Sequence, residues 1–308
     1  MTKTTSQRSY LKVVPDQRDI QAERRPTNVM RLQPDWKRML RDITSCGLIS
    51  QLVSNPVASL RSTGEPWYAD VGSHVAWVHG PGVSIAGMTD HWAFARINRS
   101  PGGKVYEHLD ICDHFGNRLL RLSLIEDSNW NGFNSLLVRQ WARRSAPLAI
   151  PVKEDLPPAL ERLEANAGLR LTGTLYENWY DTERLRYPGK PVDASLMAPF
   201  LETLVDQICP LNILLGNQGL IQQHESTFVA YRQQGESVQL RSSTAEFTLD
   251  LGKVIGARVI NLREEGRTPP GIRLYDELCR CVAVVSLSDG AGHNDRDLWQ
   301  TLVNAILD

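Results

Sequence analysis

The chain has 308 residues, of which 42% are hydrophobic and 22% charged, so it is long enough for two globular domains with apolar cores. A formal net charge of −1 gives no overall attraction to nucleic acid or to an anionic membrane surface. No apolar stretch reaches the roughly 18 residues that span a bilayer, and the N-terminal residues lack the apolar core of a signal peptide. With five scattered cysteines, these features predict a cytoplasmic protein with reduced thiols, no membrane insertion and no nucleic-acid partner.

The first half of the chain is predicted to be helices followed by a series of strands. Residues 1–30 are largely polar and mixed in charge, which predicts a mobile N-terminal arm. After Asp35, a plausible N-cap, apolar side chains recur at i, i+3, i+4 and i+7, which predicts a helix. A second helix is predicted at 48–53. Turn-forming residues then separate predicted strands at 57–60, 75–78, 83–85, 92–98, 106–110 and 118–124, and a helix at 130–144 closes this half.

The second half repeats this order of elements. Two prolines within 146–155 predict a linker, which a helix at 157–166 follows. A helix at 196–208 carries one apolar face. Successive strands joined by short turns favour antiparallel pairing, and helices segregated from strands favour an α+β fold. The predicted strands are 211–215, 220–223, 228–232, 238–241, 246–251, 256–262, 272–275 and 281–287, before a final helix at 295–307.

The two halves also resemble each other in sequence at an offset of about 163 residues. The segment Leu109-Asp110-Ile111-Cys112-Asp113 corresponds to Ile272-Arg273-Leu274-Tyr275-Asp276. A repeat this long is typical of a duplicated domain. We therefore predict an α+β fold of two homologous halves, each an antiparallel β-sheet with helices packed on one face. The predicted domains are the arm at 1–30, a first repeat at 31–145, a linker with a helix at 146–194 and a second repeat at 195–308.

No generic motif assigns a catalytic activity to this chain. It has no nucleophile elbow, Walker loop, zinc-protease motif or dinucleotide-binding glycine pattern. Cys279 and Cys281 share one side of a predicted strand, where small buried thiols are commoner than a metal site, so no metal centre is predicted. Among the seven histidines, His91 beside a carboxylate and His224 after two glutamines are the best candidates for binding a ligand.

One run in the second half is the most specific signature in the sequence. Gly216-Asn217-Gln218-Gly219-Leu220-Ile221-Gln222-Gln223-His224 is similar to a V-G-N-x-G-x-I-Q-I-H run of the haemin-degrading and haemin-transport family, the HemS/HmuS/ChuX-like proteins. Pattern-level similarity extends over 35–145 and 195–307, for example at Gly64-Glu65-Pro66-Trp67-Tyr68 and Trp92-Ala93-Phe94-Ala95. The resemblance implies a duplicated α+β fold and a cytoplasmic haem-utilisation protein, which receives haem after import and passes it on or assists its degradation.

Three positions depart from this family at its expected haem contacts. Where the family has an axial histidine in W-x-x-M-T-D-V-H-x-F-F, the nearest match has Glu183. Ala86 replaces the arginine of D-L-R-x-F, and Ser288 falls where Q-F-F-G-x-R has an arginine, whereas Arg263 matches the arginine of R-K-P-T. A carboxylate is a poor ligand of haem iron, and lost arginines remove partners of the propionates, so we expect haem binding to be weaker than in the family, or absent.

The resemblance and the residues together give a candidate haem site. We expect a cleft between the halves, near 176–196 and the second sheet. Tyr180, Tyr187 or His91 is the candidate axial ligand, because tyrosine ligates haem iron in some proteins. Residues 176–190 combine aromatic and cationic side chains that suit a planar anionic ligand, although an inter-domain connector also fits this composition. The remaining candidate haem-binding residues are Arg184, Arg186, Arg263 and His224.

Two functions remain open from the sequence. The first is haem utilisation and iron transport, with a haem importer or a haem-accepting protein as partner. The alternative is a diverged non-haem scaffold or regulatory protein, which has lost the family's haem ligands and binds another planar anionic ligand or a protein. A haem-degrading oxygenase needs an axial ligand and an O₂ pocket, neither of which the sequence places, so enzymatic activity stays open as well.

Overall fold

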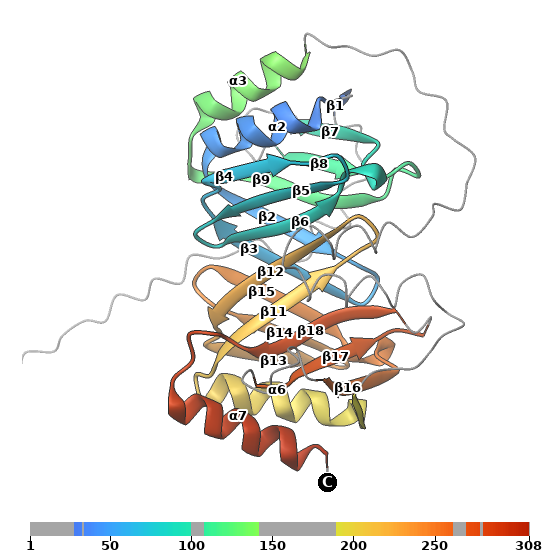
Figure 1. Cartoon of the computed structure of the whole chain (residues 1–308), viewed down its shortest axis with the longest axis vertical. Helices are drawn as coiled ribbons and strands as arrows, with labels where there is room; N and C mark the ends of the chain where they lie inside the picture. Colours follow the sequence, from blue (N-terminus) through green and yellow to red (C-terminus); the bar gives the residue numbers. More distant parts are fainter. Residues whose placement is uncertain are drawn as a thin grey trace, which may run out of the picture.

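The protein consists of two nine-stranded β-sheets with a pair of helices at each end of an elongated body (Figure 1). The structure, a computed structural model, describes residues 28–32, 34–99, 108–141, 189–260, 269–277 and 280–307. Every strand pair in the described ranges is antiparallel, and the helices are segregated from the strands. The α+β class predicted from the sequence is therefore confirmed.

The strands of each sheet follow in spatial order. The first sheet contains β1 (Asn28–Leu32), β7 (Phe94–Arg99), β8 (His108–Cys112), β9 (Arg118–Ser128), β2 (Gly47–Ser54), β3 (Ala58–Gly64), β15 (Ala245–Asp250), β14 (Ser237–Arg241) and β13 (Ala230–Gln234). The second sheet contains β10 (Lys190–Val192), β16 (Gly256–Ile260), β17 (Gly271–Tyr275), β18 (Cys281–Leu287), β11 (Pro210–Gly216), β12 (Leu220–Thr227), β6 (Val83–Met88), β5 (Val75–Gly80) and β4 (Tyr68–Val71).

Each sheet takes strands from both halves of the chain. In the first sheet β3 pairs with β15, and in the second sheet β12 pairs with β6. The expectation that each half forms its own sheet is therefore wrong: β4–β6 extend the second sheet and β13–β15 extend the first. The exchange has a physical benefit, because it satisfies the backbone groups of β3 and β12 that would otherwise lie at an open sheet edge.

The order of strands is nevertheless the same in both sheets. If nine is added to each strand number of the first sheet, and the numbering returns to β1 after β18, the result is the strand order of the second sheet. Asp113 and Asp276, which the sequence aligns, follow directly after the corresponding strands β8 and β17. Corresponding residues of the two halves therefore occupy corresponding places in the two sheets.

Two asparagine side chains form equivalent hydrogen bonds between the halves. The Asn55 side-chain amide donates to the carbonyl of Gly216 at 2.9 Å, and the Asn217 amide donates to the carbonyl of Ser54 at 3.3 Å. Each asparagine therefore binds the residue that precedes the other one, as a two-fold relation between the halves requires.

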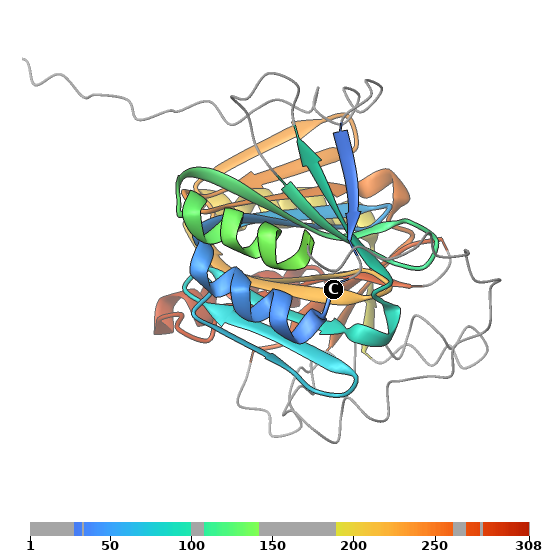
Figure 2. The ribbon, with the colours of Figure 1, turned by 90° about the horizontal axis from the view of Figure 1, so that it is seen from above.

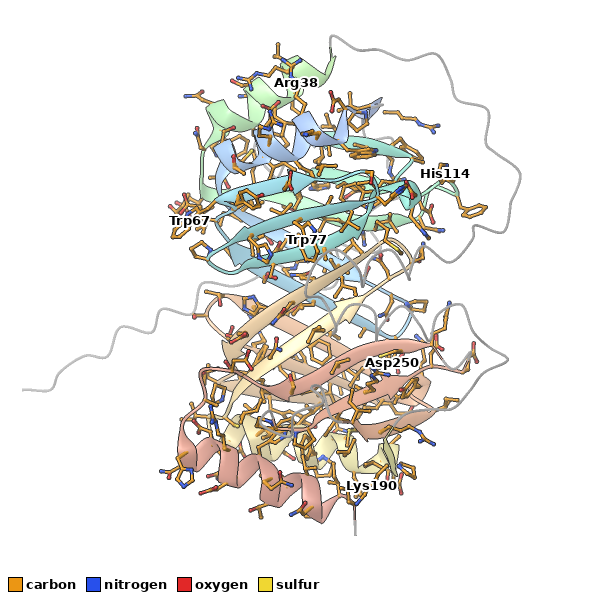
Figure 3. All side chains as sticks on the ribbon, viewed as in Figure 1. Arg38, Trp67, Trp77, His114, Lys190 and Asp250 are labelled. Atoms are coloured by element: carbon orange, nitrogen blue, oxygen red, sulfur yellow. The ribbon has the colours of Figure 1, made fainter. Side chains whose placement is uncertain are left out.

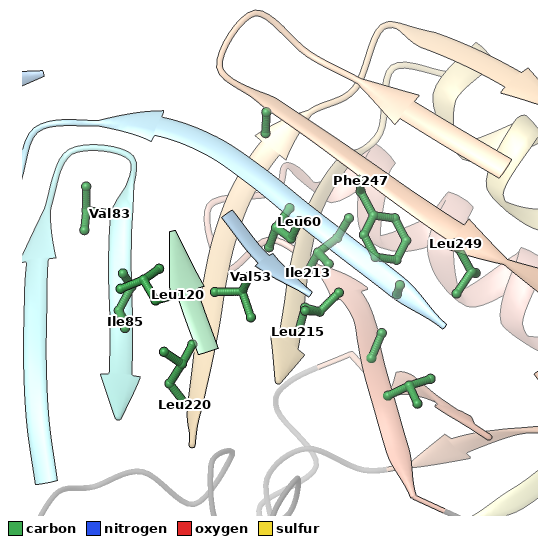
Figure 4. Packing of buried hydrophobic residues seen from close by; sticks show 14 of the residues in the cluster. Val53, Leu60, Val83, Ile85, Leu120, Ile213, Leu215, Leu220, Phe247 and Leu249 are labelled. Atoms are coloured by element: carbon green, nitrogen blue, oxygen red, sulfur yellow. The ribbon is translucent and has the colours of Figure 1, made fainter. Parts of the chain in front are cut away.

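The apolar core lies between the sheets. Figure 4 shows side chains of the first sheet, such as Val53 and Leu60, packed against Ile213 and Leu215 of the second. We call these facing sides the inner faces of the sheets. Beyond the middle, helices cover the inner faces: α2 (Trp36–Ile43) and α3 (Trp130–Trp141) lie side by side at one end (Figure 2), and α6 (Met197–Asp206) and α7 (His293–Ala305) lie at the other.

Helix α2 forms as predicted. The Asp35 carboxylate accepts a hydrogen bond from the Arg38 backbone N–H at 3.2 Å, and Met39, Leu40 and Ile43 are buried. The second helix, predicted at 48–53, is wrong, because this segment is strand β2. None of the described helices is long and apolar enough to cross a membrane.

Other boundaries differ from the sequence-based prediction. Strand β1 begins at Asn28, inside the range expected to be an arm, and β10 lies at the end of the predicted linker. Strand β4 was not predicted, because its exposed or half-exposed side chains carry no apolar alternation. The helix expected at 157–166 lies outside the described residues.

Candidate ligand-binding face

The side of the second sheet that faces away from α6 and α7 is the candidate site. Residues directly opposite each other on paired strands point to the same face of a sheet. Ile272 and Leu274 of β17 belong to the inner core, so Arg273 between them points outward. The cross-strand register then defines one outer-face row, made of Arg258, Arg273, Val284, Leu214 and Gln223.

A second row lies two residues further along the strands. It contains Ile221, which is opposite Ala86, and Trp77, which is opposite Ala86 on the other side. Leu214, Ile221, Val284 and Ala86 are all buried, so the centre of the outer face is apolar and shielded from water. The apolar character of these side chains matches the body of a planar hydrophobic ligand.

The two ends of the outer face differ in chemistry. At the β5 end, the Trp77 ring (Figure 3) stacks on the His79 ring with centroids 6.0 Å apart. At the β17 end, Arg273 is 2% exposed and its Nε atom has no hydrogen-bond partner in the described structure. Burial raises the pKa of the neighbouring Tyr275 hydroxyl, and Arg273 offsets this only in part. The face is therefore aromatic at one end and cationic at the other.

His91, a candidate axial ligand, lies at the end of β6 in a single 3₁₀ turn, Thr89–His91. Its side chain is 7% exposed. Burial lowers the pKa of His91, Asp90 and Asp113 raise it, and His114 lowers it further. Asp90 itself pairs with His74 at 2.7 Å. A buried imidazole held in its neutral form is the form that ligates metals.

His224, the second candidate, lies on the inner face instead. It is opposite Ile213 and 3% exposed, between the two sheets. Burial lowers the pKa of His224, and a hydrogen bond with the Gly82 backbone raises it. Next to it the Ser62 hydroxyl accepts from the side-chain amides of Gln51 at 2.7 Å and Gln222 at 2.9 Å. His224 therefore does not lie on the outer face.

The other predicted residues are distributed as follows. Ala86 lies in the outer-face row described above, and Ser288 follows β18 and donates to the Glu225 carboxylate at 2.5 Å. Tyr180, Tyr187, Glu183, Arg184, Arg186 and Arg263 lie outside the described residues.

Sequence reasoning missed the cationic end of this face. Arg273 and Tyr275 are the outward positions of a strand whose inward positions are Ile272 and Leu274. A signal was present, since an arginine in the middle of an otherwise apolar strand marks a cation that the fold must bury. What the sequence lacked was the neighbour, because the partner strand β16 places Arg258 opposite Arg273.

Comparison with solved structures finds the same architecture in haem proteins. ChuS, a heme oxygenase of Escherichia coli, superposes with a TM-score of 0.73 at 15% identity, over 91% of this chain and 89% of ChuS. Holo-PhuS, a heme-binding protein from Pseudomonas aeruginosa, superposes with a TM-score of 0.73 at 17% identity, over 90% of this chain and 86% of PhuS. No protein-family model and no curated protein sequence matches the chain. The chain therefore has the fold of the HemS/ChuS-like haem proteins, as its sequence resemblance predicts.

Proposed function

We propose that this chain is a diverged HemS/ChuS-like haem-utilisation protein, which binds haem on the outer face of its second sheet. The observation that carries the proposal is the buried apolar row on that face, with a cationic end, in a fold shared with a heme oxygenase and a heme-binding protein. In this proposal the protein acts in the cytoplasm, receives haem after import and delivers it to an accepting or degrading protein.

The residues of the outer face fit haem as a cargo. Leu214, Ile221 and Val284 are apolar, as the flat ring requires, and the Nε of Arg273, which has no hydrogen-bond partner in the described structure, can donate to a carboxylate. Tyr180 and His91 remain the proposed axial ligands. Tyr275 is less suited, because its raised pKa disfavours the phenolate that would bind iron.

We also infer that the two halves arose by duplication. The identical strand order of the two sheets and the reciprocal bonds of Asn55 and Asn217 support this origin. A duplicated fold has two outer faces, which selection can alter separately.

A visible-absorption titration of the purified protein with haemin tests the function. We expect saturation at one equivalent with a Kd on the order of micromolar, because two or three charge-assisted contacts of the family are missing at about 1.5–3 kcal/mol each. Absence of any Soret shift at excess haemin contradicts the proposal.

Restoring the missing arginine provides a gain-of-function test. Ala86→Arg should tighten haemin binding by about tenfold or more, since one charge-assisted contact is worth that much. Ser84→Arg is the matched control, because Ser84 lies two residues earlier on the same strand and outside the apolar row. Equal effects of the two substitutions would place the ligand elsewhere.

A second candidate is a non-haem planar anion. The centre of the outer face is apolar, because Ala86 stands where the family has an arginine. No described side chain at this centre is suited to bind haem iron. Iron-free protoporphyrin IX distinguishes the two: if it binds as tightly as haemin, iron contributes nothing to recognition and the non-haem function is favoured.

A further inference from the structure

A row of arginines crosses the outer face of the first sheet. Leu109 and Ile111 of β8 belong to the inner core, so Asp110 between them points outward. The cross-strand register then defines one row that runs over every strand of this sheet, from β1 to β13. In spatial order this arginine row contains Arg31, Arg96, Asp110, Arg121, Leu52, Arg61, Glu246, Arg241 and Ala230.

The arginine row carries more positive charge than its own carboxylates balance. Asp110 is 1% exposed and accepts two hydrogen bonds from Arg121, at 2.7 and 3.0 Å, while Arg96 lies 3.7 Å away. Glu246 pairs with Arg241 at 3.4 Å. Five arginines therefore stand against two carboxylates in this row, although the formal net charge of the whole chain is −1.

Two arginines of the row present this excess charge to solvent. Arg61 is exposed and forms no hydrogen bond or ion pair with a described residue. Arg31 is also exposed, and its guanidinium lies 3.8 Å from the centre of the Phe94 ring, a contact that leaves the charge without a counter-ion. Beside the row, on the same face, Arg232 of β13 is exposed opposite Gln239. Exposed guanidinium groups of this kind can bind carboxylates through their forked donors.

The second sheet shows that the fold forms without these cations. Strand β10 corresponds to β1, and it has Pro191 in the place of Arg31. Strand β12 corresponds to β3, and it has Gln223 in the place of Arg61. The same strand order therefore does not depend on arginine at these two positions, which points to a role of the arginines at the surface.

We propose that the arginine row binds an acidic, extended segment of a partner protein. Arg31 and Arg241 are seven strand spacings apart, so at about 4.8 Å per spacing the row is about 34 Å long. This length matches about ten residues of extended polypeptide, which rises about 3.3 Å per residue. The adjoining row on the same face is polar, so the segment meets groups that form hydrogen bonds. That row contains Asn98, His108, Ser123, Ser50 and Thr63.

The order of charges in the row favours a polypeptide over a nucleic acid. Asp110 and Glu246 interrupt the arginines. A polypeptide can place acidic side chains opposite the arginines and uncharged ones opposite Glu246, whereas each nucleotide carries a phosphate. Grooves that bind single-stranded nucleic acid also offer aromatic side chains on which the bases stack, and the arginine row contains none.

Fluorescence anisotropy with a labelled peptide tests this binding surface in the full-length protein. The probe is a fluorescein-labelled decapeptide of alternating glutamate and serine, and a decapeptide of alternating glutamine and serine is the uncharged control. At low ionic strength the wild type should bind the acidic peptide about tenfold or more tightly than the uncharged one. Salt at about 0.5 M should remove this preference, because it screens charges at the surface.

Charge reversal then locates the peptide on the protein. Arg61→Glu combined with Arg232→Glu should weaken binding of the acidic peptide by about tenfold or more, because two attractions become repulsions. Lys37→Glu combined with Arg38→Glu is the matched control, with the same change of charge at two exposed positions of α2. The control should change binding by less than about twofold, since α2 covers an inner face.

A milder variant guards against a loss of folding. Arg61→Gln introduces the residue type that the second sheet has at the corresponding place, and it should weaken binding by about threefold. If the melting temperature of the charge-reversed variant falls, Arg61→Gln decides the test. Haemin binding should be the same in both variants as in the wild type, because the proposed haem site lies on the other sheet. Failure of the haemin titration therefore leaves this test intact.

The remaining outcomes contradict the proposal. Equal binding of the acidic peptide by the wild type and Arg61→Gln overturns it, and so do equal losses in the row variant and the α2 control. A wild type that binds neither peptide at about 1 mM also overturns it. If a labelled strand of ten thymidine nucleotides binds more tightly than the acidic peptide, and the row variant loses that binding, the arginine row is a nucleic-acid surface instead.

Discussion

Replacing Asn217 by alanine should destabilise the protein strongly, because this side chain joins both halves. Asn217 is 3% exposed. Its amide donates to the carbonyls of Leu119 at 2.7 Å and Ser54 at 3.3 Å, and its oxygen accepts from the backbone N–H groups of Gly219 at 3.1 Å and Leu220 at 3.2 Å. The alanine variant leaves two donors and two acceptors without these partners in a buried place.

The magnitude follows from these four contacts. A buried polar group without a partner costs about 1–3 kcal/mol, and water that enters the new cavity recovers part of that cost. We therefore expect a loss of about 3 kcal/mol in the free energy of unfolding, which corresponds to a fall of about 6–12 °C in melting temperature for a domain of this size. Asn304→Ala, at an exposed position of α7, should change the stability by no more than about 0.5 kcal/mol.

Asn217→Asp tests the same contacts through their charge. The carboxylate keeps the size of the amide, but it faces the carbonyl oxygens of Leu119 and Ser54 and donates to neither, so its folded-state pKa should rise above the unfolded value of about 3.9. A raised folded pKa means that stability is retained at low pH and lost as pH rises. Urea unfolding at pH 5 and pH 8, relative to the wild type, should show a larger deficit at pH 8. A loss below about 1 kcal/mol for Asn217→Ala, or an equal deficit of Asn217→Asp at both pH values, would refute this account.

Three further predictions concern buried polar groups. Ser62→Ala removes the acceptor of Gln222 and should cost about 1–3 kcal/mol in urea unfolding, whereas a cost no greater than that of half-exposed Ser59→Ala would contradict the network. Because burial lowers the pKa of His224, the unfolded chain binds a proton there more readily than the folded chain, so stability should fall as pH drops below about 6.5. His224→Gln should make this fall in stability less steep. An unchanged slope of stability against pH would contradict the role given to His224. Burial raises the thiol pKa to about 12 for Cys46 and Cys281 and to about 11 for Cys112 and Cys209. A thiol reagent at pH 8 should therefore modify these four cysteines only when the protein unfolds. Rapid labelling of the native Cys279→Ser variant would disprove this.

The sequence predicts individual helices and strands better than it predicts which strands pair with one another. Helix α2 is found because its apolar residues recur at helical spacing and Asp35 caps it. Strand β2 is mistaken for a helix because Ile49 and Val53 are also one helical turn apart. What decides between the two is pairing with β3 and β9, which lie elsewhere in the chain. The exchange of strands between the halves is hidden for the same reason, since hydrophobic alternation identifies a strand but not its neighbour.

The candidate site shows the same limit. In the run from Ile221 to His224, polar residues occupy both alternating sets of positions, so the sequence does not say which side is buried in the core. The structure places Gln222 and His224 inward, where Gln222 donates a hydrogen bond to Ser62 of the other half and His224 lies opposite Ile213. Arg273 could be recognised as an outward residue from its own strand, but its cross-strand neighbours, Arg258 and Val284, are known only from the pairing with β16 and β18.

The two sheets therefore divide stability and binding between their faces. Their inner faces carry the shared core and the polar bonds that fix one half on the other, so substitutions there act on the whole fold. Alternation along each strand leaves the outer faces free to change without disturbing that core. In the first sheet the buried Asp110 carboxylate is paired within the protein, because it accepts two hydrogen bonds from Arg121 and lies 3.7 Å from Arg96. In the second sheet the buried Arg273 stands at the same position, so the two outer faces differ in charge at this point.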